Sequence, residues 1–140
     1  MGYRQVVTAS GHENVTAAHG STFEVTTDDY LTPAGDCILG IEADRAASDF
    51  DPEFVAACQD RGAAITVTVR AGGHEASVAA RGDPDLTFDS DRSCVVRTSD
   101  HVDDRTVAVG AEHAADGFDH GMVEALSDGA ELTFELTVET

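Results

Sequence analysis

The chain has 140 residues, a length typical of one domain, and its 41% of hydrophobic residues supports a folded core and excludes a disordered chain. Its 27 acidic residues face only 8 basic ones, all arginines, which gives a net charge of -19 without a single lysine. Such a surface repels itself in dilute salt and is screened in molar salt, so the composition predicts a halophilic protein.

The first half of the chain predicts strands and short helices in a fixed order. Alternating or continuous apolar segments indicate strands at residues 5–9, 22–27, 36–41 and 63–69. Between the last two strands we expect a helical turn that Asp44 opens. A helix then follows, with Asp51 at its N-cap and Pro52 at its first position.

The second half repeats this pattern. The segment EADRAASDFDPEFVAACQDRGAAITVTV aligns with GAEHAADGFDHGMVEALSDGAELTFELTV, and SGHENVT and STFEVTTDDYL align with RGDPDLT and RSCVVRTSDHV. The expected strands lie at residues 77–80, 106–109 and 131–138, and Glu112 is the counterpart of Asp44. The turn Ala71-Gly72-Gly73 joins the copies. We therefore predict one domain, residues 1–140, made of two internal repeats, 1–72 and 73–140.

These elements predict the fold class. Strands outnumber helices, so we expect a mainly β protein, α+β by its helix content. Antiparallel strands would form a sandwich or barrel from two tandem pseudo-symmetric units, with short helices covering the open ends. The groove between the two units is the natural place for a binding site.

Polar residues that occur in only one copy are the candidate site. Packing explains residues that both copies share, whereas buried polar groups must be paired or used. The first copy alone carries the predicted ligand-binding residues His12, Asn14, His19, Thr22 and Asp36. We expect them to gather in a partly open groove, with the two histidines on its wall and Asp36 near its floor.

Metal binding and nucleophilic catalysis are weaker interpretations of the same segment. His12, His19 and Cys37 are the candidate metal ligands, but none of the tight spacings typical of metal sites is present, so no metal is predicted. Cys37 with a histidine base has the residue types of a nucleophilic site, yet a cysteine at the start of an apolar strand is commonly inert. No cofactor motif is found.

Location and partners follow from the remaining features. The N-terminal MGYRQVVTASG has no apolar segment of a signal peptide, and no apolar run approaches the ~20 residues of a membrane helix. Cys37, Cys58 and Cys94 are odd in number without Cys-x-x-Cys, which favours reduced thiols. We expect a cytoplasmic protein without membrane contact. The acidic charge disfavours nucleic acid as a partner without excluding it.

The stretches GHENVTAAHGSTFEVTTDDYLTPAGDCILGIEADRAA and RGDPDLTFDSDRSCVVRTSDHVDDRTVAVGAEHAAD resemble the archaeal domain-of-unknown-function family numbered 371, over nearly the whole chain. The resemblance implies a compact, mainly β fold and an archaeal source, and the acidic composition resembles haloarchaeal proteins. It implies no activity, and the cofactor is left open. Members often read Gly-His in the second copy, where this chain has Gly82-Asp83.

Three functions stay open. The first is a small binding module for a polar ligand or a protein partner, with the first-copy residues lining its groove. The second is a metal-assisted or Cys-dependent hydrolase that uses His12, His19, Asp36 and Cys37. The third is a structural subunit of a larger assembly. The lack of a strong catalytic motif favours the first or the third, and whether the protein is an enzyme is left open.

Overall fold

The computed structural model describes residues 2–139. Its first half contains β1 (Gly2–Ser10), β2 (Thr22–Thr26), β3 (Ile38–Gly40), the 3-10 helix η1 (Ala47–Asp49), α1 (Pro52–Cys58) and β4 (Ala64–Ala71). The second half contains β5 (His74–Arg81), β6 (Ser93–Arg97), β7 (Thr106–Ala108), the 3-10 helix η2 (Ala115–Gly117), α2 (His120–Ser127) and β8 (Glu131–Glu139). The order of elements is the same on both sides of the Gly72-Gly73 turn.

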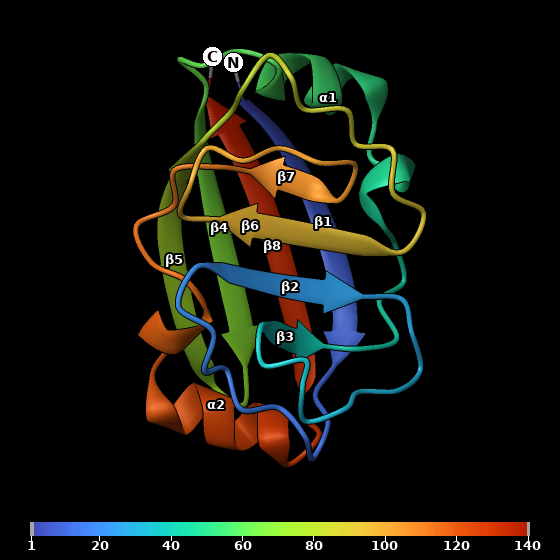
Figure 1. Ribbon diagram of the computed structural model, residues 1–140, viewed down its shortest axis with the longest axis vertical. Helices are drawn as coiled ribbons and strands as arrows, with labels where there is room; N and C mark the ends of the chain where they lie inside the picture. The colour runs from blue at the N-terminus through green and yellow to red at the C-terminus, as the bar shows by residue number, and fades with distance from the viewer. Residues whose placement is uncertain (1, 140) are drawn as a thin grey trace.

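The strands form two open sheets, with the orders β1-β8-β4-β5 and β3-β2-β6-β7. The sheets lie face to face and cross steeply, and α1 and α2 cover opposite ends (Figure 1). The predicted mainly β fold with short helices over the open ends is thus confirmed, in the form of a sandwich. One detail differs from the prediction: β3 and β7 run parallel to β2 and β6, because long loops return the chain to the starting end of each strand.

The core lies between the two sheets, because alternate residues of each strand point inward. Phe23 and Val25 of β2 and Phe134 and Leu136 of β8 are fully buried there. The rings of Phe23 and Phe134 meet edge to face with centroids 6.4 Å apart, which joins the two sheets directly. Burying each such side chain contributes about 1.5–3 kcal/mol.

Each end helix is approached closely by a glycine that follows an edge strand of the other half. A Cβ at Gly11, just after β1, would lie 2.0 Å from the carbonyl oxygen of Leu126 in α2. A Cβ at Gly82, just after β5, would lie 2.1 Å from that of Cys58 in α1. Only glycine fits either position, so both halves dock their strands on a helix in the same way.

Two acids that we expected to open helical turns bind an edge strand instead. The Asp44 carboxylate accepts a hydrogen bond from the Thr8 N–H of β1, at 2.9 Å, and Glu112 does the same for Ala79 of β5, at 2.7 Å. Both acids therefore cover donors at the two edges of one sheet, where unpaired N–H groups invite association. The 3-10 helices begin after Ala46 and Ala114, further along the chain.

Candidate functional site

His12 and Asn14 form a tight turn after β1. The Nδ1 atom of His12 accepts a hydrogen bond from the backbone N–H of Asn14, at 3.0 Å. The Asn14 side-chain amide in turn donates to the carbonyl oxygen of Leu31, at 2.8 Å. This bond ties the loop after β1 to the loop that leads from β2 to β3.

His19 forms a second turn just before β2. Its Nδ1 accepts hydrogen bonds from the N–H groups of Ser21, at 3.2 Å, and Thr22, at 3.1 Å. Asp36 takes part through its backbone: its carbonyl oxygen accepts from the N–H groups of Ala18, at 3.0 Å, and His19, at 3.3 Å. Four of the five predicted site residues thus lie along two neighbouring loops, residues 11–21 and 28–37, that are bonded to each other. The fifth, Thr22, is the first residue of β2.

The second half makes both turns with different residues. Asp83, the counterpart of His12, accepts from the N–H of Asp85 at 2.9 Å. Ser90, the counterpart of His19, accepts from the N–H groups of Arg92, at 3.2 Å, and Ser93, at 3.1 Å. Turn formation therefore accounts for the placement of both imidazoles.

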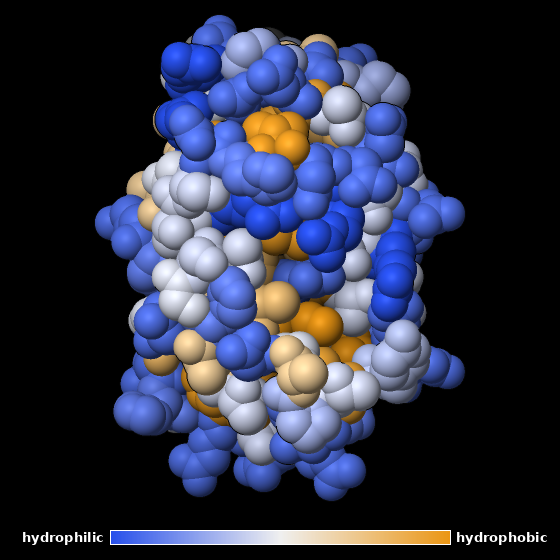
Figure 2. All heavy atoms as spheres, viewed as in Figure 1, coloured by the Kyte–Doolittle hydropathy of each residue, from blue (hydrophilic) through white to orange (hydrophobic). Residues whose placement is uncertain are grey.

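Glu24 and its counterpart Val95 differ in chemistry and lie on the outer face of the β3-β2-β6-β7 sheet. Phe23 and Val25 point into the core, so the side chains of Thr22 and Glu24 point to the opposite face. There they lie beside their partners on β6, Arg97 and Val95. Figure 2 looks onto this face, where hydrophilic residues surround a hollow that exposes hydrophobic atoms. We call the outer face around Thr22, Glu24, Val95 and Arg97 the sheet groove.

Glu24 is the unusual residue of the sheet groove. It is only 7% exposed, and its carboxylate accepts a hydrogen bond from the thiol of Cys37, with Sγ 3.5 Å from Oε1. A thiol is a weak hydrogen-bond donor. Burial, reinforced by the negative charge of Glu24, raises the pKa of the Cys37 thiol to about 11. At neutral pH the sulfur therefore carries its proton and can donate it to the carboxylate.

Glu24 and Cys37 belong to a row of four positions that crosses the sheet. The N–H of Glu24 donates to the carbonyl of Cys37 at 2.9 Å, and the N–H of Val95 donates to that of Arg105 at 2.8 Å. Glu24 and Val95 face each other across β2 and β6. In the ladder, Glu24 pairs with Ile38 and Val95 with Thr106, so Cys37 and Arg105 each lie one residue before these partners. We call Cys37, Glu24, Val95 and Arg105 the row, and its outer and inner pairs are equivalent positions of the two halves.

The Arg105 end of the row is organised by Asp103. The Asp103 carboxylate accepts from Arg97 at 2.8 Å, from Arg105 at 3.2 Å and from the Thr106 hydroxyl at 2.9 Å. Burial opposes its charge, but the hydrogen bonds from Thr106 and Arg105 and the charge of Arg97 hold the pKa of Asp103 well below its ordinary value. Asp103 is thus a carboxylate at all ordinary pH values and fixes the loop before β7.

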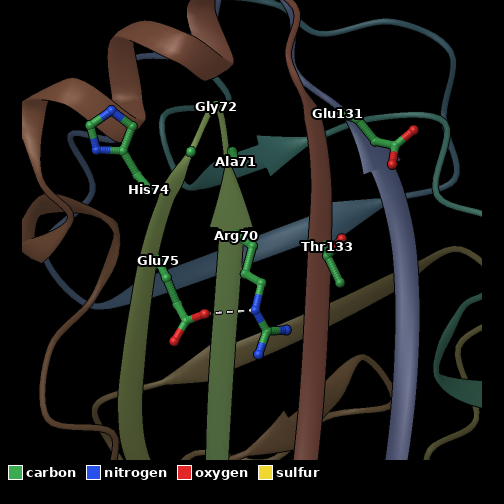
Figure 3. Close-up of a pocket in the computed structure, with 8 residues that line it drawn as sticks. Arg70, Ala71, Gly72, His74, Glu75, Glu131 and Thr133 are labelled. Carbon is green, nitrogen blue, oxygen red and sulfur yellow. Dashed lines mark hydrogen bonds and ion pairs between the residues drawn. The ribbon is translucent and has the colours of Figure 1, made fainter.

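A second hollow, of about 350 Å³, lies on the outer face of the other sheet near the β4–β5 turn. Arg70 lies there beside Glu75, 2.8 Å away, while His74 and Glu131 point to opposite sides (Figure 3). Arg70 also pairs with Glu135 at 3.4 Å. This hollow is wide open and its central charges are already paired, and it contains none of the residues predicted from the sequence.

The candidate metal ligands are not assembled into a metal site. Within residues 2–139, no three His, Cys, Asp or Glu side chains gather at distances suited to a metal ion. His12 and His19 use Nδ1 to close separate turns, and Cys37 contacts Glu24.

Comparison with known proteins gives two matches. A family model described as Domain of unknown function (DUF371) matches residues 7–139. The uncharacterized protein MJ0206 of the archaeon Methanocaldococcus jannaschii is 35% identical over 133 residues, which cover 95% of this chain and 98% of that protein. Among the described residues, no helix is long and apolar enough to cross a membrane.

Proposed function

This chain belongs to the DUF371 family, and we propose that it is a small binding module that holds a polar ligand in the sheet groove. We further propose that the module arose by duplication of one unit, now residues 1–72 and 73–140, and works in the cytoplasm of a salt-loving archaeon. The observation that carries the proposal is the buried carboxylate of Glu24.

A buried carboxylate is costly unless charges or several hydrogen bonds compensate it. Glu135, the other buried glutamate of the described chain, is paired with Arg4 and Arg70. Glu24 has the Cys37 thiol instead, and its counterpart in the second half is a valine. A ligand with N–H donors or a positive charge would pair with this carboxylate more strongly than the thiol does. His12, Asn14, His19, Thr22 and Asp36 would then act by shaping the wall of the groove.

The two alternative functions receive less support. A Cys-dependent hydrolase needs a thiolate, but the pKa of Cys37 is raised to about 11, and His19 already uses Nδ1 for its turn. A structural subunit would bind through an apolar surface, whereas Tyr30 is the one large hydrophobic residue that is exposed in the described part of the chain.

The test is a pair of substitutions at Glu24. Glu24→Val installs the residue of the second half, and Glu24→Gln keeps the shape without the charge. We expect both unliganded variants to melt at a higher temperature, because removing a buried, weakly paired charge gains about 1–3 kcal/mol. In a thermal-shift screen of amino acids, amines and nucleosides in molar KCl, compounds that stabilise the wild type should not stabilise these variants.

The exposed Glu53→Gln provides the control for a change of one charge, and it should leave both the melting temperature and the ligand response unchanged. A lower melting temperature for both Glu24 variants would mean that the carboxylate serves the fold. Ligand responses that persist without Glu24 would place the binding site elsewhere. Either result overturns the proposal.

A further inference from the structure

We infer that the ligand of the sheet groove carries two opposite charges, an ammonium group that binds Glu24 and a carboxylate that binds Arg105, joined by a short hydrocarbon chain. Amino acids with a terminal amine have this chemistry. The inference rests on the proposed function and adds the class of ligand to it.

The geometry of the row supports two separate charges. Glu24 and Arg105 lie two strands apart, so their backbones are about 10 Å from each other at the usual spacing of neighbouring strands. Within residues 2–139, no ion pair joins Glu24 to an arginine. Burial lowers the pKa of Arg105, but the Asp103 hydrogen bond and the charges of Asp103 and Glu24 raise it overall. The two groups attract each other across a gap.

Val95 lies between the two groups in the sheet. Its side chain is 2% exposed and lies between Glu24 and the strand that Arg105 precedes. A carboxylate and a guanidinium on either side of an apolar residue match a molecule with charged ends and a methylene chain between them. The chain would gain contact with the valine, and each end would gain an ionic hydrogen bond.

Arg105, and not Arg97, is the cation with hydrogen-bond donors to spare. The Arg97 side chain is 12% exposed and uses Nε for Thr106 and Nη2 for Asp103. The Arg105 side chain is 45% exposed, and its Nη2 donates to the Asp103 carboxylate. A guanidinium has five N–H donors, so Arg105 retains enough for a carboxylate.

Three probes of matched length separate the contributions: 5-aminopentanoate with both charges, pentylamine with the positive charge alone and pentanoate with the negative charge alone. Binding is followed by NMR titration of the backbone amides in molar KCl. We expect 5-aminopentanoate to bind at least about tenfold tighter than either single-charge probe, which is a difference of about 1.4 kcal/mol. Amides of β2, β6 and residue 105 should shift.

Variants assign each end of the ligand. Arg105→Gln should reduce binding of 5-aminopentanoate to the level of pentylamine and leave pentylamine itself unchanged, while Glu24→Gln should abolish binding of both. Arg61→Gln removes one exposed arginine outside the groove and should change nothing. Because these substitutions lie on the surface or relieve a buried charge, the folded state is expected to persist, which the amide spectra report directly.

The outcomes separate this inference from the proposed function. If pentylamine binds as tightly as 5-aminopentanoate and Arg105→Gln has no effect, the ligand has one charge, and the inference fails while the groove remains a binding site. If other compounds bind through Glu24 and none of the three probes does, the inference also fails. If no compound depends on Glu24, both proposals fail.

Discussion

The two halves of the molecule make the same backbone contacts with different side chains. The Gly11 N–H bonds the carbonyl of Ala130 at 2.8 Å, and the Gly82 N–H bonds that of Ala63 at 3.0 Å. His19 and Ser90 close the same turn in front of β2 and β6. A residue type can therefore change between the halves wherever the new side chain still presents one acceptor at the same place.

The halves differ in another way along the row across the sheet groove. A carboxylate replaced by a valine, and a thiol replaced by a guanidinium, do not present equivalent groups to the backbone. The main-chain bonds at these positions are the same in both halves, so the fold does not require the difference. The comparison teaches that the candidate site is marked by equivalent positions whose side chains cannot make the same interactions. A residue type that occurs in only one half, but makes the same hydrogen bond as its counterpart, does not mark it.

The largest expected effect is the unfolding of both halves together at low salt. Residues 1–72 hold 11 acids and 4 arginines, and residues 73–140 hold 16 acids and 4 arginines, so the net charges are -7 and -12. When KCl is lowered from molar to ~0.1 M, screening is lost and we expect unfolding. Because β8 lies between β1 and β4, the halves should unfold in one transition. Circular dichroism across a salt series measures this, and an unchanged spectrum and melting temperature would contradict it.

Substitution of either docking glycine should be the most damaging single change. Gly11→Ala and Gly82→Ala place a methyl group about 2 Å from a helix carbonyl, so strand and helix must separate. We expect similar losses of about 4 kcal/mol or more, seen by thermal unfolding in molar KCl. Gly62→Ala, at an exposed position without a close backbone neighbour, is the matched control. Very unequal losses for Gly11 and Gly82 would break the equivalence of the halves.

Asp103 offers a pH test of the second half alone, since its counterpart in the first half is Gly35. Because its folded pKa is lowered, Asp103 contributes stability above the ordinary pKa of about 3.9 and loses it as pH falls toward the folded value. Asp103→Asn should cost about 2 kcal/mol near neutral pH, because Arg97 and Arg105 lose their shared partner.

The difference in unfolding free energy between wild type and Asp103→Asn should shrink as pH falls below 4. Asp100→Asn, on the exposed part of the same loop, should show no such trend. A pH-independent difference would mean that the asparagine disturbs packing and that the ion pairs contribute little.

Sequence patterns were sufficient for most of the strands and for α1 and α2, because alternation, helix caps and the glycine turn are local signals. The strand β6 was indicated only by the alignment of the two copies, and Asp44 and Glu112 bind edge strands where we expected them to open helical turns. The patterns were insufficient for the parallel pairing of β3 and β7, which depends on where a long loop returns. Glu24 was missed because an acid at an alternating strand position looks like an ordinary exposed residue. Its signal was present in the alignment of STFEVTT with RSCVVRT, where the glutamate meets a valine. Its burial depends on the loops that surround the groove, which no local pattern reveals.

The smallest and most selective effects come from exchanging turn residues between the halves. If His12 and His19 only close turns, then His12→Asp and His19→Ser, which install the residues of the second half, should change the unfolding free energy by less than about 0.5 kcal/mol. His12→Ala and His19→Ala remove the acceptor and should cost about 1 kcal/mol each, as lost caps do. The reciprocal Asp83→Ala and Ser90→Ala should cost similar amounts.

The same variants also decide what the histidines do for binding. With the turns intact, the His12→Asp and His19→Ser proteins should keep the loops of residues 11–21 and 28–37 in place and bind 5-aminopentanoate as the wild type does. Full stability combined with lost binding would show that an imidazole contacts the ligand, which turn formation does not require. The site would then extend from the row at Glu24 to the loop that the two histidines shape, and the first half would supply more of it than the row alone.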